Sequence, residues 1–355
     1  MRTSYFFLLL LLFVSFSSCN KKATPLIDAS KKLYQGQTMN TSQVLSTIAL
    51  GSCNKQDAKQ DMWPYIQQND PQLWIWLGDN IYGDSEDMQV MKNKYLQQKF
   101  GTAYTSFRQA IPVVGIWDDH DYGANNAGKE FPKRAESQAL MLDFLDVTAD
   151  AAVRKQAGAY QSYTFGPQGK QVKVILLDSR YHRDAPTINP NRPPTYLPNE
   201  DGTILGQAQW QWLEKELANS EAQVHLIGNG IQVIPQDHDY EKWFNFPKER
   251  EKLFTLLAKY QVAHPILLSG DRHIAEISKL PIEGLSSSVY ELTTSGMTHS
   301  YEKVGEETNR HRVSKLIGKR NFAVIKIDWE AQPLKIDLEV RGLKNVIHTA
   351  TQVKD

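Results

Sequence analysis

Cysteine is almost absent from this sequence, which has only Cys19 and Cys53 among its 355 residues. If Cys19 is modified or removed, Cys53 cannot form an internal disulfide. An excess of either charge is also lacking, because 40 Lys and Arg residues balance 40 Asp and Glu residues. No basic field suggests nucleic acid, and no specific nucleic-acid partner is expected. A Gly-x-Ser-x-Gly elbow is missing too, which argues against acyl-transfer hydrolases.

Long apolar runs are scarce, and the one clear case lies at the N-terminus. Residues 5–16 are continuously apolar or aromatic apart from Ser15, follow Arg2 and end at Ser17-Ser18-Cys19. About 20 residues are needed to span a bilayer as a helix, so this shorter run fits the core of a secretory signal better than a membrane span. A short buried helix is the plainer alternative, but a helix from residue 5 without a polar face is a poor candidate.

The end of the apolar run predicts how the chain is divided. Phe16-Ser17-Ser18-Cys19 resembles a bacterial lipobox, in which the cysteine becomes the acylated first residue, although Phe16 stands where Leu is usual. We therefore predict a lipoprotein signal peptide at 1–18, a polar tether at 19–45 and one domain at 46–355. Simple cleavage and secretion remains the alternative. The protein is expected to be exported and membrane-anchored, in the periplasm or cell envelope.

From about residue 46 the sequence alternates short apolar runs with amphipathic segments, which predicts an α/β domain of two sheets packed face to face with helices outside. The predicted strands are 47–50, 73–77, 113–117, 172–177, 224–227, 266–268, 289–293, 322–327 and 334–340. The predicted helices are roughly 59–68, 88–100, 134–145, 206–218 and 248–260. The Pro-rich segment 186–198 is predicted to be a long loop, and loops of that length are often functional.

Polar side chains follow six of the predicted strands at the point where each strand ends. In open α/β sheets ligands bind beyond the carboxyl ends of the strands, so these clusters predict a site for metal and anion. The clusters are Gly51-Ser-Cys53-Asn54, Gly78-Asp79-Asn-Ile-Tyr82, Asp118-Asp119-His120-Asp121, Asp178-Ser-Arg180, Gly228-Asn-Gly230 and Gly270-Asp271-Arg-His273.

Each cluster has a plainer interpretation. Gly-Asp after a strand is more often a turn than a ligand, Tyr82 could be packing, and Cys53 could be a small core residue. Three carboxylates around His120 are nevertheless costly to crowd together without a cation. His225 and His264 begin buried strands and are predicted to be structural. His299, His311 and His348 lie in the β-rich tail without a carboxylate motif and are set aside.

Four of these motifs, taken in order, resemble those of the alkaline phosphatase D (PhoD) family. They are Gly51-Ser-Cys53, Gly78-Asp79-Asn-Ile-Tyr82, Trp117-Asp-Asp-His-Asp121 and Gly270-Asp-Arg-His273. The family is a branch of the calcineurin-like metallophosphoesterases, and the resemblance spans about residues 46–280. It implies a four-layer α/β/β/α sandwich with a dinuclear metal site. We expect the chain to lack the long N-terminal β domain of many family members, and we expect its substrate preference to differ from theirs.

The resemblance also implies a role for each site residue. Fe³⁺ with nearby Ca²⁺ would be held by the expected metal ligands, which are Cys53, Asp79, Tyr82, Asp119, Asp271 and His273. Asn125 or Asn126 could add a neutral ligand. His120 would contact the phosphate or protonate the leaving oxygen, and Arg180 would bind phosphate. A metal-activated water would then attack phosphorus in small phosphoester substrates.

Two other functions stay open at this point. A hydrolase of the same fold could act on diesters, such as phospholipids, in place of monoesters. A non-catalytic surface lipoprotein could keep the fold alone, although the complete ligand set argues against it. The tryptophans could line an apolar site, although filling the core is the simpler interpretation. The protein is expected to be a monomer.

Export can be tested directly. We expect the mature chain from the native host to begin at Cys19 with a lipid on its N-terminus, measured by mass spectrometry. Cys19→Ala should release the protein in soluble form, because the acylated residue is then missing. An uncleaved and unmodified N-terminus would contradict the prediction.

Overall fold

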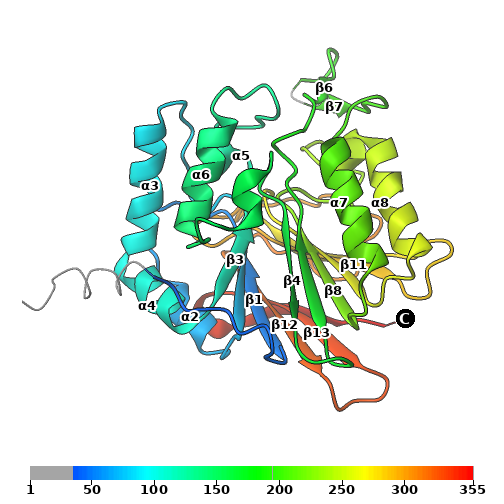
Figure 1. Cartoon of the computed structure of the whole chain (residues 1–355). Helices are drawn as coiled ribbons and strands as arrows, with labels where there is room; N and C mark the ends of the chain where they lie inside the picture. The colour runs from blue at the N-terminus through cyan, green and yellow to red at the C-terminus, as the bar shows by residue number, and fades with distance from the viewer. Residues whose placement is uncertain (1–34, 194, 355) are drawn as a thin grey trace, which may run out of the picture. The chain divides into compact units, whose positions relative to one another are not determined.

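The computed structural model describes residues 35–193 and 195–354, and their strands form two six-stranded sheets (Figure 1). The first sheet has the order β14-β13-β12-β1-β2-β3 and the second β10-β11-β9-β8-β5-β4. Their strands are β1 (Thr47–Gly51), β2 (Leu73–Leu77), β3 (Val113–Ile116), β4 (Gln161–Phe165), β5 (Val172–Leu176), β8 (Val224–Gly228), β9 (Pro265–Ser269), β10 (Ala275–Leu280), β11 (Val289–Thr294), β12 (Phe322–Asp328), β13 (Lys335–Arg341) and β14 (Ile347–Gln352).

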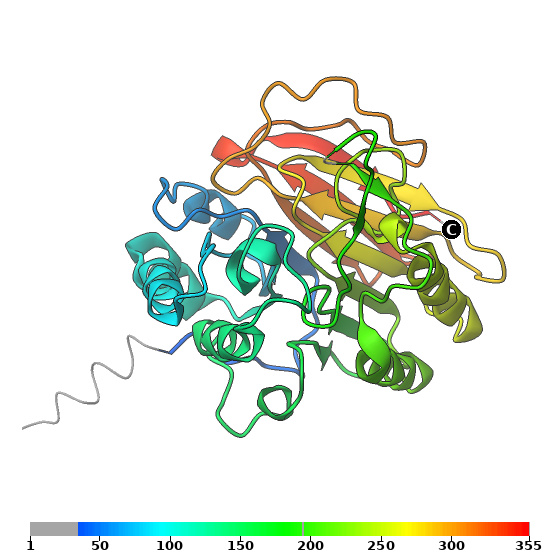
Figure 2. The same ribbon diagram turned by 90° about the horizontal axis from the view of Figure 1, so that it is seen from above.

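Helices cover the outer face of each sheet. Figure 2 shows the blue-to-teal helices on one side and the green and yellow helices on another. The first group is α2 (Trp63–Gln67), α3 (Met88–Phe100), α4 (Thr102–Ala110), α5 (Asp119–Tyr122) and α6 (Arg134–Phe144), and the second is α7 (Gly206–Ala218) and α8 (Pro247–Lys259). Short 3₁₀ turns lie at Ala152–Lys155, Trp243–Asn245 and Leu343–Asn345. The predicted α/β fold of two sheets flanked by helices is confirmed.

The core explains why these segments fold as they do. Strands β2, β5, β8 and β9 are buried along their whole length, as expected for parallel strands covered on both faces. Large aromatic side chains pack beside β2, where Trp63 lies edge-on to Trp74 and Trp76 at ring-centroid distances of 5.2 and 5.4 Å. Since Trp117 and Trp243 are also fully buried, these tryptophans fill the core and do not line a binding site.

Strand direction gathers the polar clusters at one edge. In the first sheet β1, β2 and β3 run parallel, and in the second β5, β8, β9 and β11 do. The carboxyl ends of neighbouring parallel strands meet at the same edge of a sheet. The residues that follow these strands therefore converge, as the sequence predicts.

Several elements were not predicted. The chain forms helices α4 and α5 and strands β4, β10 and β14 outside the predicted segments, and 186–198 contains a small hairpin, β6 (Thr187–Ile188) with β7 (Tyr196–Leu197). The amphipathic pattern at 59–68 becomes only the short α2, because Pro64 sets its start.

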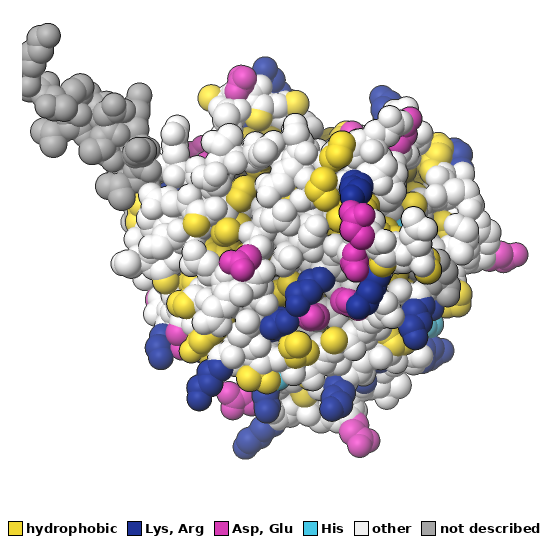
Figure 3. All heavy atoms as spheres, turned by 90° about the horizontal axis from the view of Figure 1, so that it is seen from below, with side chains coloured by type: hydrophobic (Ala, Val, Ile, Leu, Met, Phe, Trp, Pro, Cys, Tyr) yellow, Lys and Arg dark blue, Asp and Glu magenta, His cyan; other side chains and the backbone are white. Residues whose placement is uncertain are grey.

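One face of the surface and the described helices bear on contact with a membrane. The face seen in Figure 3 intersperses Lys and Arg with Asp and Glu, and its apolar side chains are scattered. Within residues 35–193 and 195–354, no helix has both the length and the apolar character needed to cross a bilayer. The predicted signal peptide, Cys19 and most of the tether lie outside the described residues and stay predictions.

Candidate metal centre

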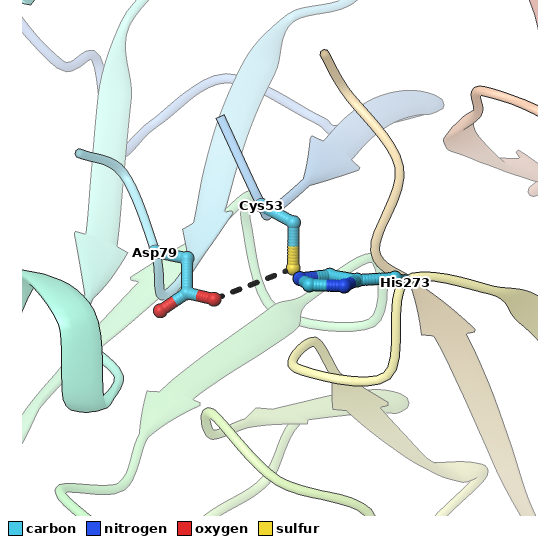
Figure 4. A group of neighbouring side chains, drawn as sticks. All are labelled: Cys53, Asp79 and His273. Atoms are coloured by element: carbon cyan, nitrogen blue, oxygen red, sulfur yellow. Dashed lines mark hydrogen bonds between the residues drawn. The ribbon is translucent and has the colours of Figure 1, made fainter. Parts of the chain in front are cut away.

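Five donor side chains meet where β1, β2, β9 and β11 end. The Cys53 thiol lies 3.5 Å from Asp79 Oδ2, with the His273 ring beside it (Figure 4). Tyr82 Oη lies 3.0 Å from His273 Nε2 and 3.0 Å from His299 Nε2. The two imidazole nitrogens are 3.2 Å apart. We call this group, Cys53, Asp79, Tyr82, His273 and His299, the mixed-donor cluster.

Carboxylates form a second group that adjoins the first. Ligand atoms of Asp118, Asp119 and Asp271 lie within 4.8 Å of one another, and the same holds for Asp79, Asp119 and His120. We call Asp79, Asp118, Asp119 and Asp271 the carboxylate cluster. Asp79 belongs to both clusters, which is the position that a bridging ligand between two ions requires.

Buried oxygens without partners indicate that cations belong here. Asp79 Oδ1 and Asp118 Oδ2 have no hydrogen-bond partner among the described residues, although buried polar atoms almost always have one. Sulfur, imidazole and phenol donors suit a transition metal, whereas a set of carboxylates suits a hard cation. The residues present therefore fit two different metal ions.

The pKa shifts express the same crowding of negative charge. Burial, together with nearby Asp119, raises the pKa of Asp271 to about 7. Burial and the neighbouring carboxylates also raise the pKa of Asp79 well above its usual range. For Asp119, burial alone would raise the pKa, but Arg180, His120 and two backbone N–H groups hold it below the ordinary value. The two raised pKa values reflect the cost of ionising one acid beside others in a site with little water, whereas the lowered pKa of Asp119 reflects its positive and N–H neighbours.

Tight backbone turns deliver the ligands. Cys53, Asp79, Asp271 and His273 all have left-handed conformations, with φ of 57°, 49°, 65° and 53°. Such conformations are uncommon for residues other than glycine and cluster at functional sites. They turn each side chain out of its strand direction and into the site.

The turn at Asp79 depends on two neighbours. Gly78 has φ +92°, and a Cβ on it would come within 2.3 Å of Asp118 Cβ, so only glycine lets the two strand ends approach. The Asp121 carboxylate accepts hydrogen bonds from the backbone N–H groups of Asp79, Asn80 and Asp118. Asp121 therefore positions the ligand loops and does not itself face the ions.

His120 is oriented by a carboxylate. Its Nδ1 lies 2.6 Å from Asp84 Oδ1, and its ring packs against the Tyr82 ring at a centroid distance of 4.3 Å. Burial alone would lower the pKa of His120, but the hydrogen bond with Asp84 and the charge of Asp119 raise it above its ordinary value. Because the Asp84 carboxylate can only accept a hydrogen bond, Nδ1 of His120 must carry a proton. The other ring nitrogen, Nε2, is then the one available to the carboxylate cluster.

Arg180, which is predicted to bind phosphate, lies buried beside the carboxylate cluster. Arg180 is 0% exposed, its Nε donates to Asp118 Oδ1 at 2.6 Å, and its Nη1 lies 2.8 Å from Glu241. Its Nη2 is buried and has no hydrogen-bond partner among the described residues, so the two carboxylates do not satisfy the whole guanidinium. Arg180 therefore supplies a buried positive charge beside the carboxylate cluster, and its predicted contact with phosphate stays a prediction.

The two asparagines, Asn125 and Asn126, lie near the carboxylate cluster. Asn126 donates its backbone N–H to Asp119 Oδ2 at 2.6 Å and its side-chain amide to Tyr196 Oη at 3.0 Å. Asn125 is exposed and lines the cleft outside the clusters. Their predicted role as neutral ligands stays a prediction.

His299 is the site residue that sequence reasoning set aside. It follows β11, which pairs in parallel with β9, so it reaches the same sheet edge as His273. The sequence motifs do not predict a site role for His299, because no carboxylate accompanies it. Its position shortly after another buried strand is the sequence feature that indicates such a role.

An open cleft leads to the clusters. It has a volume of about 530 Å³, and His120, Asp271 and His273 lie in its wall, together with residues of the β6–β7 hairpin. A small substrate can therefore reach the carboxylate cluster from solvent.

Comparison with known proteins gives consistent matches. The family model described as PhoD-like phosphatase matches residues 48–328. Alkaline phosphatase D of Bacillus subtilis (strain 168) is 24% identical over 262 residues, covering 64% of this chain and 43% of that protein, so the chain spans less than half of that relative. A solved structure of PhoD aligns with a TM-score of 0.71 and 17% identity over 89% of this chain and 70% of its own. A dimetal phosphatase from Danio rerio aligns with a TM-score of 0.56 and 13% identity over 88% and 99%.

Replacing one carboxylate tests the metal centre. We expect Asp271→Asn to lower the metal content of the purified protein, because the cluster loses a negative ligand. The metal-stripped variant should melt no lower than the metal-stripped wild type, since one repelling charge is gone, while the rise in melting temperature on adding metal should shrink. Asp143→Asn is the matched control, since Asp143 lies on α6 with 68% of its side chain exposed. Wild-type metal content in Asp271→Asn would contradict the assignment.

Proposed function

Since the chain belongs to the PhoD-like phosphatase family, we propose that it is a metal-dependent phosphoester hydrolase. One observation carries the proposal: two adjoining ligand clusters share Asp79 and contain buried carboxylate oxygens without partners. A protein that kept the fold only for binding would have no need to maintain this accumulation of buried charge. We therefore favour a hydrolase over the non-catalytic alternative.

Each cluster would hold one ion. The mixed-donor cluster has the donors that Fe³⁺ prefers, and the carboxylate cluster has those of Ca²⁺ or another hard dication. When bound, such a pair supplies Lewis acidity, which activates water and offsets the charge of the phosphoryl group. Arg180 pairs with Asp118 and holds its carboxylate in place, while burial still raises the pKa of Asp118 well above its usual range.

His120 is the residue placed to move a proton. Asp84 fixes the ring through Nδ1, and the raised pKa keeps the imidazole protonated to a higher pH than a free histidine. As the bond from phosphorus to the leaving oxygen breaks, the departing oxygen gains negative charge, and a proton from Nε2 would neutralise it. His120 also belongs to one ligand group, so metal binding is the competing role.

Substrate and location complete the proposal. The open cleft admits small phosphoesters, and we favour monoesters because of the family, with diesters, including phospholipids, as the alternative of the same chemistry. The resemblance of residues 16–19 to a lipobox supports export and a lipid anchor in the cell envelope. We expect a monomer.

His120→Gln tests the hydrolase and the proton transfer together. The wild type should hydrolyse an aryl monoester, a bis-aryl diester or both, and their ratio assigns the substrate class. The variant should keep its metals and lose kcat by about 10²- to 10⁴-fold, the usual contribution of an acid–base group. The loss of kcat should be larger for an alkyl phosphate than for a nitrophenyl phosphate, because a good leaving group hardly needs the proton.

The control for His120 is His348→Gln, since His348 lies on β14. It should behave as the wild type in kcat and melting temperature. Loss of a metal ion in His120→Gln would make His120 a ligand, and absence of phosphoester hydrolysis by the metal-loaded wild type would refute the hydrolase.

Iron can be tested by colour. Phenolate and thiolate donors to Fe³⁺ give visible charge-transfer absorption, so the protein should be coloured. Tyr82→Phe should shift or remove the band, whereas Tyr95→Phe should not, because Tyr95 Oη donates to the Asp121 carbonyl away from the mixed-donor cluster. A colourless and fully active preparation with zinc as its only metal would refute the iron assignment.

A further inference from the structure

The cleft over the metal centre continues into a larger cavity. The second cavity has a volume of about 990 Å³ and shares five lining residues with the cleft, which are Arg192, Asp239, Tyr240, Arg272 and Tyr301. A phosphoryl group is far smaller than either space. If phosphorus sits at the carboxylate cluster, the larger cavity is available for the group that is esterified to it.

Two tyrosines stand where the cavities join. Tyr240 is 49% exposed and Tyr301 48%, which is unusual for large aromatic side chains. The Tyr240 ring stacks on the Arg272 guanidinium at 4.3 Å from the ring centroid. The Tyr301 ring lies edge-on to His273, with ring centroids 5.0 Å apart, and its backbone N–H donates to the His273 carbonyl. Both exposed rings are therefore fixed to residues that adjoin Asp271.

Arg272 is itself held rigidly, which fixes Tyr240 in turn. Its Nη1 donates to Gln232 Oε1 at 2.9 Å, and its Nη2 donates to Glu307 Oε2 at 2.8 Å. The Arg272 guanidinium is nearly fully buried, so it is not free to bind a ligand itself. It supports the Tyr240 ring that stacks on it. A preorganised aromatic surface binds a flat ligand without first losing conformational freedom.

Charge restricts what the larger cavity can accept. Its charged lining consists of five carboxylates, Asp237, Asp239, Glu302, Glu306 and Glu307, and three cationic residues, Arg192, Arg272 and Lys303. Arg272 is already paired with Glu307, and Arg192 is paired with Asp239. Asp237 is paired with Arg310, which is not a lining residue. The remaining charged lining, Glu302, Glu306 and Lys303, has an excess of one negative charge, so a second anionic group is disfavoured here.

We propose that this cavity is the leaving-group subsite and that Tyr240 and Tyr301 form an aromatic clamp for an uncharged, planar leaving group. The proposal rests on the proposed function, because phosphorus must sit at the metal centre. It deepens that function by naming the substrate class as phosphoesters of uncharged aromatic groups. Substrates whose leaving group carries further phosphates or carboxylates are disfavoured by the same charge.

Phosphonates test the clamp without turnover, since their phosphorus–carbon bond is not hydrolysed. We would measure the affinity of the metal-loaded protein for phenylphosphonate, methylphosphonate and 4-carboxyphenylphosphonate by calorimetry. The phenyl compound should bind about tenfold more tightly than the methyl compound, as contact with aromatic rings predicts. Tyr240→Ala and Tyr301→Ala should each reduce that advantage, and the double variant should abolish it.

Conservative variants distinguish the contribution of the aromatic rings to binding from that of the tyrosine hydroxyls. Tyr240→Phe and Tyr301→Phe should retain the phenyl advantage, because only the ring is needed. The carboxyphenyl compound should bind more weakly than the phenyl compound. Glu302→Gln should reduce this difference in affinity between the two compounds. Glu283→Gln should leave the difference unchanged, since Glu283 follows β10 at the end of the strand remote from the site.

The outcomes distinguish the clamp from the hydrolase. Equal binding of phenyl and methyl compounds, together with normal hydrolysis of an aryl phosphate, would overturn the clamp and leave the hydrolase standing. Phenyl-selective binding that the alanine variants remove, without turnover of any phosphoester, would support the clamp and overturn the hydrolase.

Discussion

Repulsion among buried carboxylates is the constraint on which this structure depends. Asp79, Asp118, Asp119 and Asp271 come from three strand ends and meet within one ligand network. Like charges in a site with little water cannot all stay ionised unless cations compensate them. One compensation is internal, since Arg180 pairs with Asp118 behind the cluster. Without metal, the raised pKa values of Asp79 and Asp271 favour protonation, which relieves the rest. Bound cations would relieve it with the carboxylates ionised, so the crowding that opposes folding of the metal-free chain would also provide affinity for ions.

Backbone conformation stores part of that cost. The candidate ligand residues Cys53, Asp79, Asp271 and His273 adopt left-handed backbone angles that residues other than glycine normally avoid. Residues of this kind persist where the surroundings over-determine them, at about 1–3 kcal/mol each. Here the surroundings include Gly78, which admits the Asp118 backbone, and the Asp121 carboxylate, which binds three backbone N–H groups. The ligand geometry is thus set mainly by the protein before an ion arrives.

Sequence patterns could predict the strands and the polar residues at their ends, because buried parallel strands read as apolar runs and their exits read as polar clusters. They could not predict which polar residues face the ions. The predicted contact of Arg180 with phosphate stays a prediction, but no local pattern indicates that its guanidinium pairs with buried Asp118 and Glu241. His299 was missed because it lies in a tail loop without a carboxylate motif. Strands β4, β10 and β14 were missed because their residues are partly exposed or irregular in pattern.

Strand order has a consequence for how the protein can be made. β1 pairs on one side with β2 and on the other with β12, whose residues lie about 275 positions later in the chain. Contacts of such long range are slow to form, because the intervening chain must first be brought together. His273 and His299 likewise reach Cys53 only after most of the chain is available. Folding of the sandwich and assembly of the ion-binding centre are therefore late events that follow synthesis, which leaves the nascent polypeptide free of tightly bound metal while it is still extended.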